Sequence, residues 1–194
     1  MKNFCLIFLS FISCSLISQD LEKYKKQYPN DDIVRLQQET IITIKLNNGS
    51  FTIHKEVYEE DLYLNNSANY NSKRSISYST FFNLDKIEAS SFSKLDGKYV
   101  ENKVVDFNEK NNLNDSFYDD SKEVGFIYPK LTKGSKTSLK LTYDIKNPRF
   151  LSAFYFGDFY PIINNKVTII ADKNIQFTFK SFQLNNGTKI TFKK

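Results

Sequence analysis

Short segments in which apolar and polar residues alternate run through most of this 194-residue chain. The clearest is 139–146, Leu-Lys-Leu-Thr-Tyr-Asp-Ile-Lys, where every second side chain is apolar. Successive side chains of a strand point to opposite faces, so this pattern predicts a strand with one buried and one solvated face. Almost no segment has the 3.6-residue period of an amphipathic helix. The chain is therefore expected to be all-β.

Turn signals separate the alternating segments. Asn48-Gly49, Asp96-Gly97 and Asn186-Gly187 each join two of them, because Asn and Gly tolerate the positive φ that tight hairpin turns require. The expected strands are 40–46, 51–57, 87–95, 99–107, 124–128, 139–146, 166–171, 175–182 and 188–192. The polar stretches 65–75 and 108–121 are expected to be loops. About nine or ten short strands with little helix predict an antiparallel β-sandwich.

Residues 1–18 have the features of a secretory signal peptide. They carry one Lys, a short apolar run and small residues near the end. The apolar run is shorter than the ~20 residues that a membrane-spanning helix needs. We expect cleavage between Ser18 and Gln19. The alternative is lipoprotein processing at Cys14, because the residues before it look like part of a lipobox. Either route predicts an exported protein of the periplasm or cell envelope.

Reactive side chains are scarce. The chain holds one His and two Cys, and both Cys lie within residues 1–18. Removal of that segment leaves 194 − 18 = 176 residues without a thiol, so we expect no disulfide, Cys nucleophile or Cys metal site. We also expect no cofactor. The net charge of +5, with both signs interspersed, predicts a solvated basic surface and no nucleic-acid partner. Residues 19–194 are expected to form one β-sandwich domain, opening with one or two helical turns that Pro29 stops.

Three patterns resemble reactive or metal sites, and each has a simpler interpretation. His54 lies on the polar side of its expected strand, as a surface histidine would. Ser91 and Lys94 have the spacing of a Ser–x–x–Lys nucleophile, but positions three apart on a strand face opposite sides. Acidic clusters at 31–32, 59–61 and 111–120 offer oxygen ligands for Ca²⁺, and 111–120 is the best of them. None has EF-hand spacing, so we expect solvated carboxylates.

The segment from Phe150 to Tyr160 is rich in aromatic residues. Its rings belong to Phe150, Phe154, Tyr155, Phe156, Phe159 and Tyr160. They either fill the sandwich core or line a groove for a glycan or peptide, since rings offer flat apolar faces. The candidate contact residues are Phe154, Tyr155 and Tyr160. We expect Tyr155 and Tyr160 to be exposed.

Five pieces of the sequence, in this order and spacing, resemble the domain-of-unknown-function 3857 family. They are 28–36, 39–46, 87–98 with its Asp-Gly-Lys hairpin, 126–135 with its aromatic–Pro and Gly–Ser pairs, and 139–143. The resemblance implies an exported, Bacteroidota-like β-sandwich placed upstream of a transglutaminase-like core. That core carries a Cys–His–Asp triad, which this sequence lacks. The family offers no catalytic residue in this domain that maps onto the chain.

Three functional hypotheses follow. The first is a non-catalytic exported module that docks on a partner domain, such as a transglutaminase-like one, or on an envelope protein. The second is a glycan- or peptide-binding module that uses Phe150 to Tyr160. The third is a hydrolase that uses carboxylates alone, which needs two facing carboxylates that no spacing here predicts. The first agrees best with the absence of a credible acid–base pair.

Overall fold

The computed structural model describes residues 20–111, 120–151, 153–176, 178–183 and 187–191. Within these ranges it has nine strands in two sheets. The strands are β1 (Ile33–Asn47), β2 (Ser50–Tyr63), β3 (Lys73–Tyr78), β4 (Phe82–Leu95), β5 (Lys98–Lys103), β6 (Asn108–Asn111), β7 (Lys122–Ile127), β8 (Lys136–Ile145) and β9 (Ile162–Ala171). The helices are a short one over residues 20–27 and the 3₁₀ turns η1 (Asn66–Asn71) and η2 (Pro148–Phe150). The all-β prediction is confirmed.

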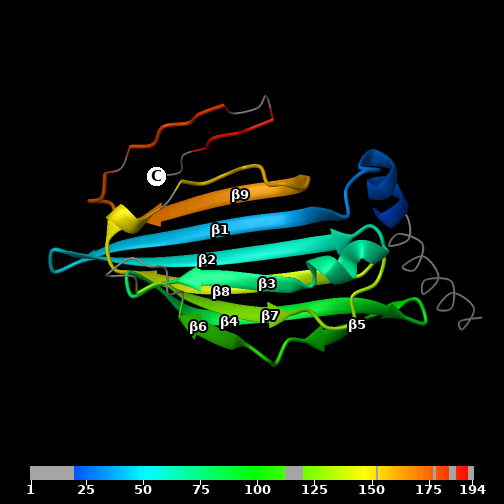
Figure 1. Cartoon of the computed structure of the whole chain (residues 1–194). Coiled ribbons are helices and arrows are strands. Elements are labelled where there is room, and N and C mark those ends of the chain that lie inside the picture. Colours follow the sequence, from blue (N-terminus) through cyan, green and yellow to red (C-terminus); the bar gives the residue numbers. More distant parts are fainter. Residues whose placement is uncertain (1–19, 112–119, 152, 177, 184–186, 192–194) are drawn as a thin grey trace, which may run out of the picture.

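The two sheets differ in size and form the layers of a sandwich (Figure 1). The large sheet has the order β5-β4-β8-β2-β1-β9, and the small sheet has the order β3-β7-β6. The small sheet lies over the β4 and β8 side of the large one (Figure 1). We call the face of the large sheet that it covers the inner face. Aromatic contacts such as Phe107–Phe126, at 5.5 Å between ring centroids, fill the space beneath this cover.

Two of the predicted hairpin turns are confirmed. Asn48 and Gly49 join β1 to β2 with φ of 50° and 80°, and Asp96 and Gly97 join β4 to β5 with φ of 50° and 77°. Two consecutive positive φ values define the tight turn whose twist matches that of the flanking strands. The third predicted turn, at Asn186-Gly187, includes residues outside the described ranges. The first two turns set the registers of the long hairpins that form most of the large sheet.

Several segments differ from the expectation. The stretches 65–75 and 108–121, expected to be loops, contain the start of β3 and all of β6. Both strands pair with β7, so cross-strand hydrogen bonding outweighs their polar composition. The described parts of 175–182 and 188–191, expected to be strands, are not strands. An alternating segment becomes a strand only where another strand pairs with it. The side chains of Phe182 and Ile190 in these segments remain 79% and 48% exposed.

Strand β9 is parallel to β1, which is an exception within the predicted antiparallel sandwich. The register pairs Arg35 with Ile162 and Ile44 with Ala171. Strand β8 also runs in the direction of β1, so β8 and β9 are parallel. The connection between them, residues 146–161, must therefore run back along the sheet from the end of β8 to the start of β9. This crossover contains the aromatic segment and runs back beside β9 (Figure 1). Half-buried Phe154 and Tyr160 pack from it onto the core.

The inner face is built in rows that cross the strands. One row joins Val167, Thr40, Val57, Leu141 and Ile87 through the registers of neighbouring strands. On β8 the predicted alternation is confirmed, because Leu139, Leu141, Tyr143 and Ile145 are all buried. The small sheet covers rows on β4 and β8, whereas the crossover covers those on β1, β2 and β9 and extends to Leu141 and Tyr143 of β8.

A second, smaller core lies at one end of the outer face. Val34, Leu62 and Leu64 are buried there beneath Leu21 and Tyr24 of the helix over residues 20–27. The predicted helical turns before Pro29 are thus confirmed, and they close this end of the sheet. Within the described ranges no helix combines the length and the apolar character needed to cross a membrane.

Candidate functional site

The three predicted contact residues lie on the crossover, but they do not form one exposed groove. Tyr155 is 77% exposed, as expected, and Phe154 is half-buried against the core. The expected exposure of Tyr160 is wrong, because its ring is half-buried. Its hydroxyl accepts a hydrogen bond from Arg35 Nη2, and the guanidinium carbon lies 5.0 Å from the ring centroid. Tyr160 therefore anchors the crossover, while Tyr155 faces solvent.

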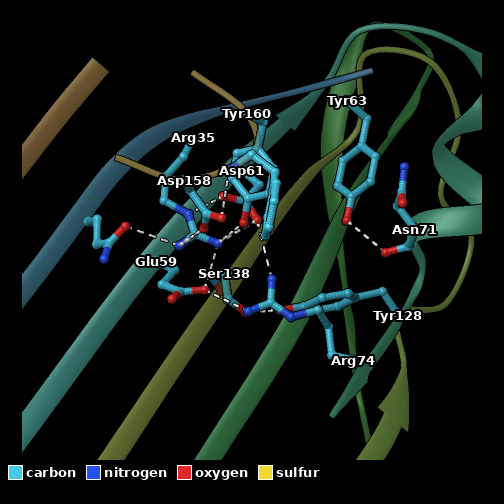
Figure 2. Close-up of polar contacts among 12 residues, drawn as sticks. Arg35, Glu59, Asp61, Tyr63, Asn71, Arg74, Tyr128, Ser138, Asp158 and Tyr160 are labelled. Atoms are coloured by element: carbon cyan, nitrogen blue, oxygen red, sulfur yellow. Dashed lines mark hydrogen bonds and ion pairs between the residues drawn. The ribbon is translucent and has the colours of Figure 1, made fainter. Parts of the chain in front are cut away.

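Arg35 belongs to a buried ion cluster, which also contains Glu59, Asp61 and Arg74 (Figure 2). Arg35 Nε donates to Asp61 Oδ1 at 2.7 Å, and Nη2 lies 2.8 Å from Glu59 Oε2. Arg74 Nη2 reaches the same Glu59 oxygen at 2.8 Å, and Arg74 Nη1 lies 3.5 Å from Asp61 Oδ2. Arg35 and Asp61 are only 2% and 3% exposed. The two arginines balance the charges of the two carboxylates.

The cluster connects the large sheet, the small sheet and the crossover. Arg35 comes from β1, Glu59 and Asp61 from β2, and Arg74 from β3 of the small sheet. The crossover contributes Tyr160 and, at 3.9 Å from Arg35 Nη1, Asp158. The cluster is thus placed at the boundary between the two covers of the inner face.

Burial and the neighbouring charges shift the pKa values of the cluster. Burial alone lowers the pKa of Arg35, but the hydrogen bond and charge of Asp61 outweigh it, so the pKa is raised and the guanidinium stays charged. Burial, reinforced by Asp61, raises the pKa of Tyr160 far above its usual value, which keeps the phenol protonated. The hydroxyl can therefore accept from Arg35 without adding a negative charge.

Sequence reasoning did not find this cluster, although one signal was available. Glu59 and Asp61 follow Ile53 and Val57 at even spacing, which places them on the same, inward-facing side of β2. They were interpreted as solvated carboxylates because charged side chains usually face outward. The partners that make burial possible are Arg35, 26 positions before Asp61, and Arg74, 15 positions after Glu59.

A cavity of about 830 Å³ lies between the crossover and the inner face of the large sheet. Its floor comes from β1, β2, β8 and β9, and residues 153–159 contribute the other wall. One end reaches Arg35, Glu59 and Asp158 of the ion cluster. Toward the other end lies Lys55, a half-buried lysine on the inner side of β2. A volume of this size is typical of sites for small molecules.

A second groove, of about 350 Å³, lies on the outer face of the large sheet. Tyr58, Phe92 and Tyr99 line it together with Lys136 and Lys140. Lys136 lies 3.0 Å from Glu60 and 5.8 Å from the ring centroid of Tyr99, while Lys140 lies 5.9 Å from that of Tyr58. The two lysine charges of this groove thus already lie beside a local carboxylate or ring.

The other sequence candidates are placed as follows. His54 lies on the outer side of β2, and its Nδ1 is 2.9 Å from Asp144 Oδ1 in an exposed cross-strand pair. Ser91 is fully buried and donates to the carbonyl of Pro129, while Lys94 lies over the ring of Tyr99. Among the residues that the structure describes, no group of His, Cys, Asp and Glu is arranged to hold a metal ion. Most of the calcium candidate 111–120 lies outside them.

The fold and the site define a β-sandwich module with a buried ion cluster and a cavity under one long connection. The sequence profile of the domain of unknown function 3857 (DUF3857), a family with a solved structure, matches residues 47–194. This chain belongs to the DUF3857 family, and the motif pieces 87–98, 126–135 and 139–143 lie within the matched residues.

Comparison with solved structures shows the same fold in a longer protein, described as a "putative protease" from Parabacteroides distasonis. The TM-score is 0.57 at 15% identity, covering 73% of this chain and 29% of that one. Two others are yeast LTA4 hydrolase with bestatin (TM-score 0.33, 13% identity, 60% and 15% covered) and an M1 zinc metallopeptidase from Deinococcus radiodurans (0.32, 11%, 62% and 23%). Those two are too distant to inform on this chain. A search of curated protein sequences finds no match.

Proposed function

We propose that this chain is an exported, non-catalytic β-sandwich module that docks on a partner domain or protein in the cell envelope. The exposed rings of the crossover support this most directly. Phe159 is fully solvated, Tyr155 is 77% exposed and Phe156 is 45% exposed. Contiguous exposed rings mark interaction surfaces, and aromatic residues are enriched at protein interfaces. We call these three residues the ring patch.

The anchoring of the crossover adds to this argument. Phe154 and Tyr160, which flank the ring patch in the sequence, pack on the core, and Tyr160 is bound to Arg35. A surface that is held in place before binding loses less conformational entropy when a partner docks. The ring patch therefore has the features of a preformed docking surface.

The proposed partner is a catalytic domain of the transglutaminase-like class. The similar Parabacteroides protein is described as a "putative protease", and this chain covers only 29% of it. The family resemblance implies a β-sandwich domain of this kind that lies upstream of a transglutaminase-like core. Both observations are consistent with a module that accompanies an enzyme.

A photo-crosslinking experiment tests the docking. A photoreactive residue at Tyr155 or Phe159, in the chain produced in its own cell, is expected to crosslink to one envelope partner. The same residue at Tyr70, which is 90% exposed on η1, serves as the control and is expected to give no such product. With the purified partner, Phe159→Ala should then weaken binding at least about tenfold. Equal crosslinking from all three positions contradicts the proposal.

The non-catalytic part of the proposal has its own test. The ionisable groups of the buried cluster bind one another, whereas a general acid or base must reach a substrate. We expect the purified chain to show no glutamine–amine transfer. Sustained turnover that Asp61→Asn abolishes would contradict a non-catalytic role.

Export is tested by the mass of the protein recovered from the periplasmic fraction. The expected N-terminus is Gln19, with Cys14 lipidation as the alternative. An uncleaved chain confined to the cytoplasm contradicts both.

The second candidate function is glycan or peptide binding by the segment from Phe150 to Tyr160. The cavity beneath this segment favours it, because ligand sites are concave and mostly apolar. Titration with cell-wall fragments, with Tyr155→Ala as the variant, separates it from docking. Saturable binding that this variant weakens supports it, and the absence of such binding removes it.

A further inference from the structure

We propose that the cavity under the crossover binds a small amphiphilic carboxylate, whose charged group pairs with Lys55. The ligand is a molecule with one carboxylate at the end of an apolar body. This inference goes beyond docking, because the charged group of the ligand would bind at Lys55 on the inner face of the sheet, whereas docking uses the solvent-exposed rings of the crossover. It also gives a ligand class to the cavity that favours the second candidate function.

Lys55 is the central observation. It lies on the inner side of β2, opposite Ile42 on β1 and Tyr143 on β8, where the other positions of the row are apolar. Its ammonium nitrogen lies 5.6 Å from the centroid of the Tyr143 ring. In the described part of the chain, no carboxylate lies within ion-pairing distance of it. A half-buried cation without an anion is costly unless something supplies one.

The local electrostatics agree with this geometry. Burial lowers the pKa of Lys55, and no neighbouring carboxylate acts against that effect. The second cation that lines the cavity, Arg35, differs, because Asp61 and Glu59 already bind it at 2.7 and 2.8 Å. Lys55 is therefore the lining cation that an incoming anion can pair with.

The apolar side chains that line the cavity are the reason for proposing a ligand with an apolar body. Besides the polar Gln38, Thr40 and Asn165, the cavity is lined by apolar side chains, which are those of Val57, Leu141 and Val167 from the sheet and of Phe154 from the crossover. These side chains bury apolar ligand atoms, while the cluster at the far end offers no open cation. A carboxylate at Lys55 with its body along this wall uses both features of the cavity.

The inference is tested by calorimetric titration of the purified chain with two pairs of probes. Decanoate and N-acetylphenylalanine carry the carboxylate, and decanol and N-acetylphenylalaninamide are their neutral counterparts. We expect at least one acid to bind about tenfold more tightly than its counterpart. The pair that responds distinguishes a fatty-acid-like ligand from a peptide C-terminus.

Two variants locate the site. Lys55→Met removes the charge and keeps the apolar stem, and we expect it to abolish the preference for the acid. Lys45→Met is the matched control, because Lys45 is exposed on the outer side of β1, and it should bind as the unmodified chain does. Equal binding of acid and neutral probes, no binding of any probe at millimolar concentration, or an unchanged preference in Lys55→Met overturns the inference.

Two further variants test the inference if Lys55→Met does not fold. Lys55→Arg retains the charge and should retain the preference, and Val167→Phe fills the cavity from its floor and should weaken acid and neutral probes alike. A Val167→Phe variant that binds as tightly as the unmodified chain contradicts the site. Phe156→Ala changes a ring-patch residue that is not among those lining the cavity, and it is expected to leave probe binding unchanged, so failure of docking and failure of ligand binding are distinguishable.

Discussion

The inner face of the large sheet is covered by the small sheet on one side and by the crossover on the other. The two covers differ in how tightly they pack, and this difference suits one to stabilising the fold and the other to binding a ligand. Under the small sheet, Phe126 and Tyr128 are each only 2% exposed, and their ring centroids lie 5.1 Å apart edge to face. Under the crossover, a single connection covers the sheet, and a cavity of about 830 Å³ remains. A regular sheet can place a side chain over each row, whereas a lone connection cannot. We infer that the first cover holds the fold and the second leaves room for a ligand.

The largest effect is expected from a matched pair of ring deletions. Phe126→Ala should lower the free energy of unfolding by about 3–5 kcal/mol, because it removes a fully packed ring and leaves a void. Phe154→Ala, on the crossover, should cost only about 1 kcal/mol, because Phe154 is half-buried beside space that is already open. Urea unfolding followed by circular dichroism measures both. Equal losses would mean that the crossover is as tightly packed as the small sheet.

The next effect concerns the ion cluster at the boundary between the covers. Asp61→Asn should cost about 3 kcal/mol, since it leaves Arg35 buried with Glu59 as its remaining close carboxylate. The control is Glu39→Gln, which breaks an exposed pair with Lys166 at 2.8 Å and should cost less than about 1 kcal/mol. The same unfolding measurements apply. If both variants lose the same small amount, the cluster does not hold the two covers together.

A smaller effect is expected at high pH. Burial raises the pKa of Tyr143, which lines the cavity, and of Tyr63, next to η1, to about 12 each. The unfolded chain loses these protons near pH 10, so stability is retained below pH 10 and lost as the pH rises to 12. Each tyrosine should account for about 2–3 kcal/mol of that loss.

Single Tyr→Phe variants test this and compare the two regions. Tyr143→Phe and Tyr63→Phe should each flatten the fall in unfolding free energy between pH 10 and 12. If Tyr143→Phe flattens it much less than Tyr63→Phe does, water in the cavity already solvates the Tyr143 hydroxyl. An unchanged slope in both variants would contradict the assigned burial.

The parts of the fold that follow from local chemistry could be predicted from the sequence. The hairpins at Asn48-Gly49 and Asp96-Gly97 follow from residues that tolerate positive φ, and the β8 segment follows from strict alternation. The tail segments were predicted wrongly, because alternation indicates that a strand is possible but not which neighbour will pair with it. For the same reason β3 and β6 were missed, since β7 supplies the pairing that their polar sequences do not announce.

The candidate site was predictable only in part. The aromatic segment was identified, and the exposure of Tyr155 was expected. The role of Tyr160 was not, because it depends on Arg35, which lies 125 positions away in the chain. The burial of Lys55 was not predicted either, because a lysine in an alternating strand is usually assigned to the solvent-facing side. Its inward position follows from the register with Ile42 and Tyr143.

The sequence by itself determined an all-β chain of the DUF3857 family, with its principal hairpins and its aromatic segment, because these depend on neighbouring residues and on period-two alternation. Only the tertiary structure decided that β9 is parallel to β1. That pairing forces residues 146–161 back across the sheet, where they cover the cavity and bring Tyr160 to Arg35. Contacts between residues so far apart depend on the path of the whole chain, which no local pattern specifies.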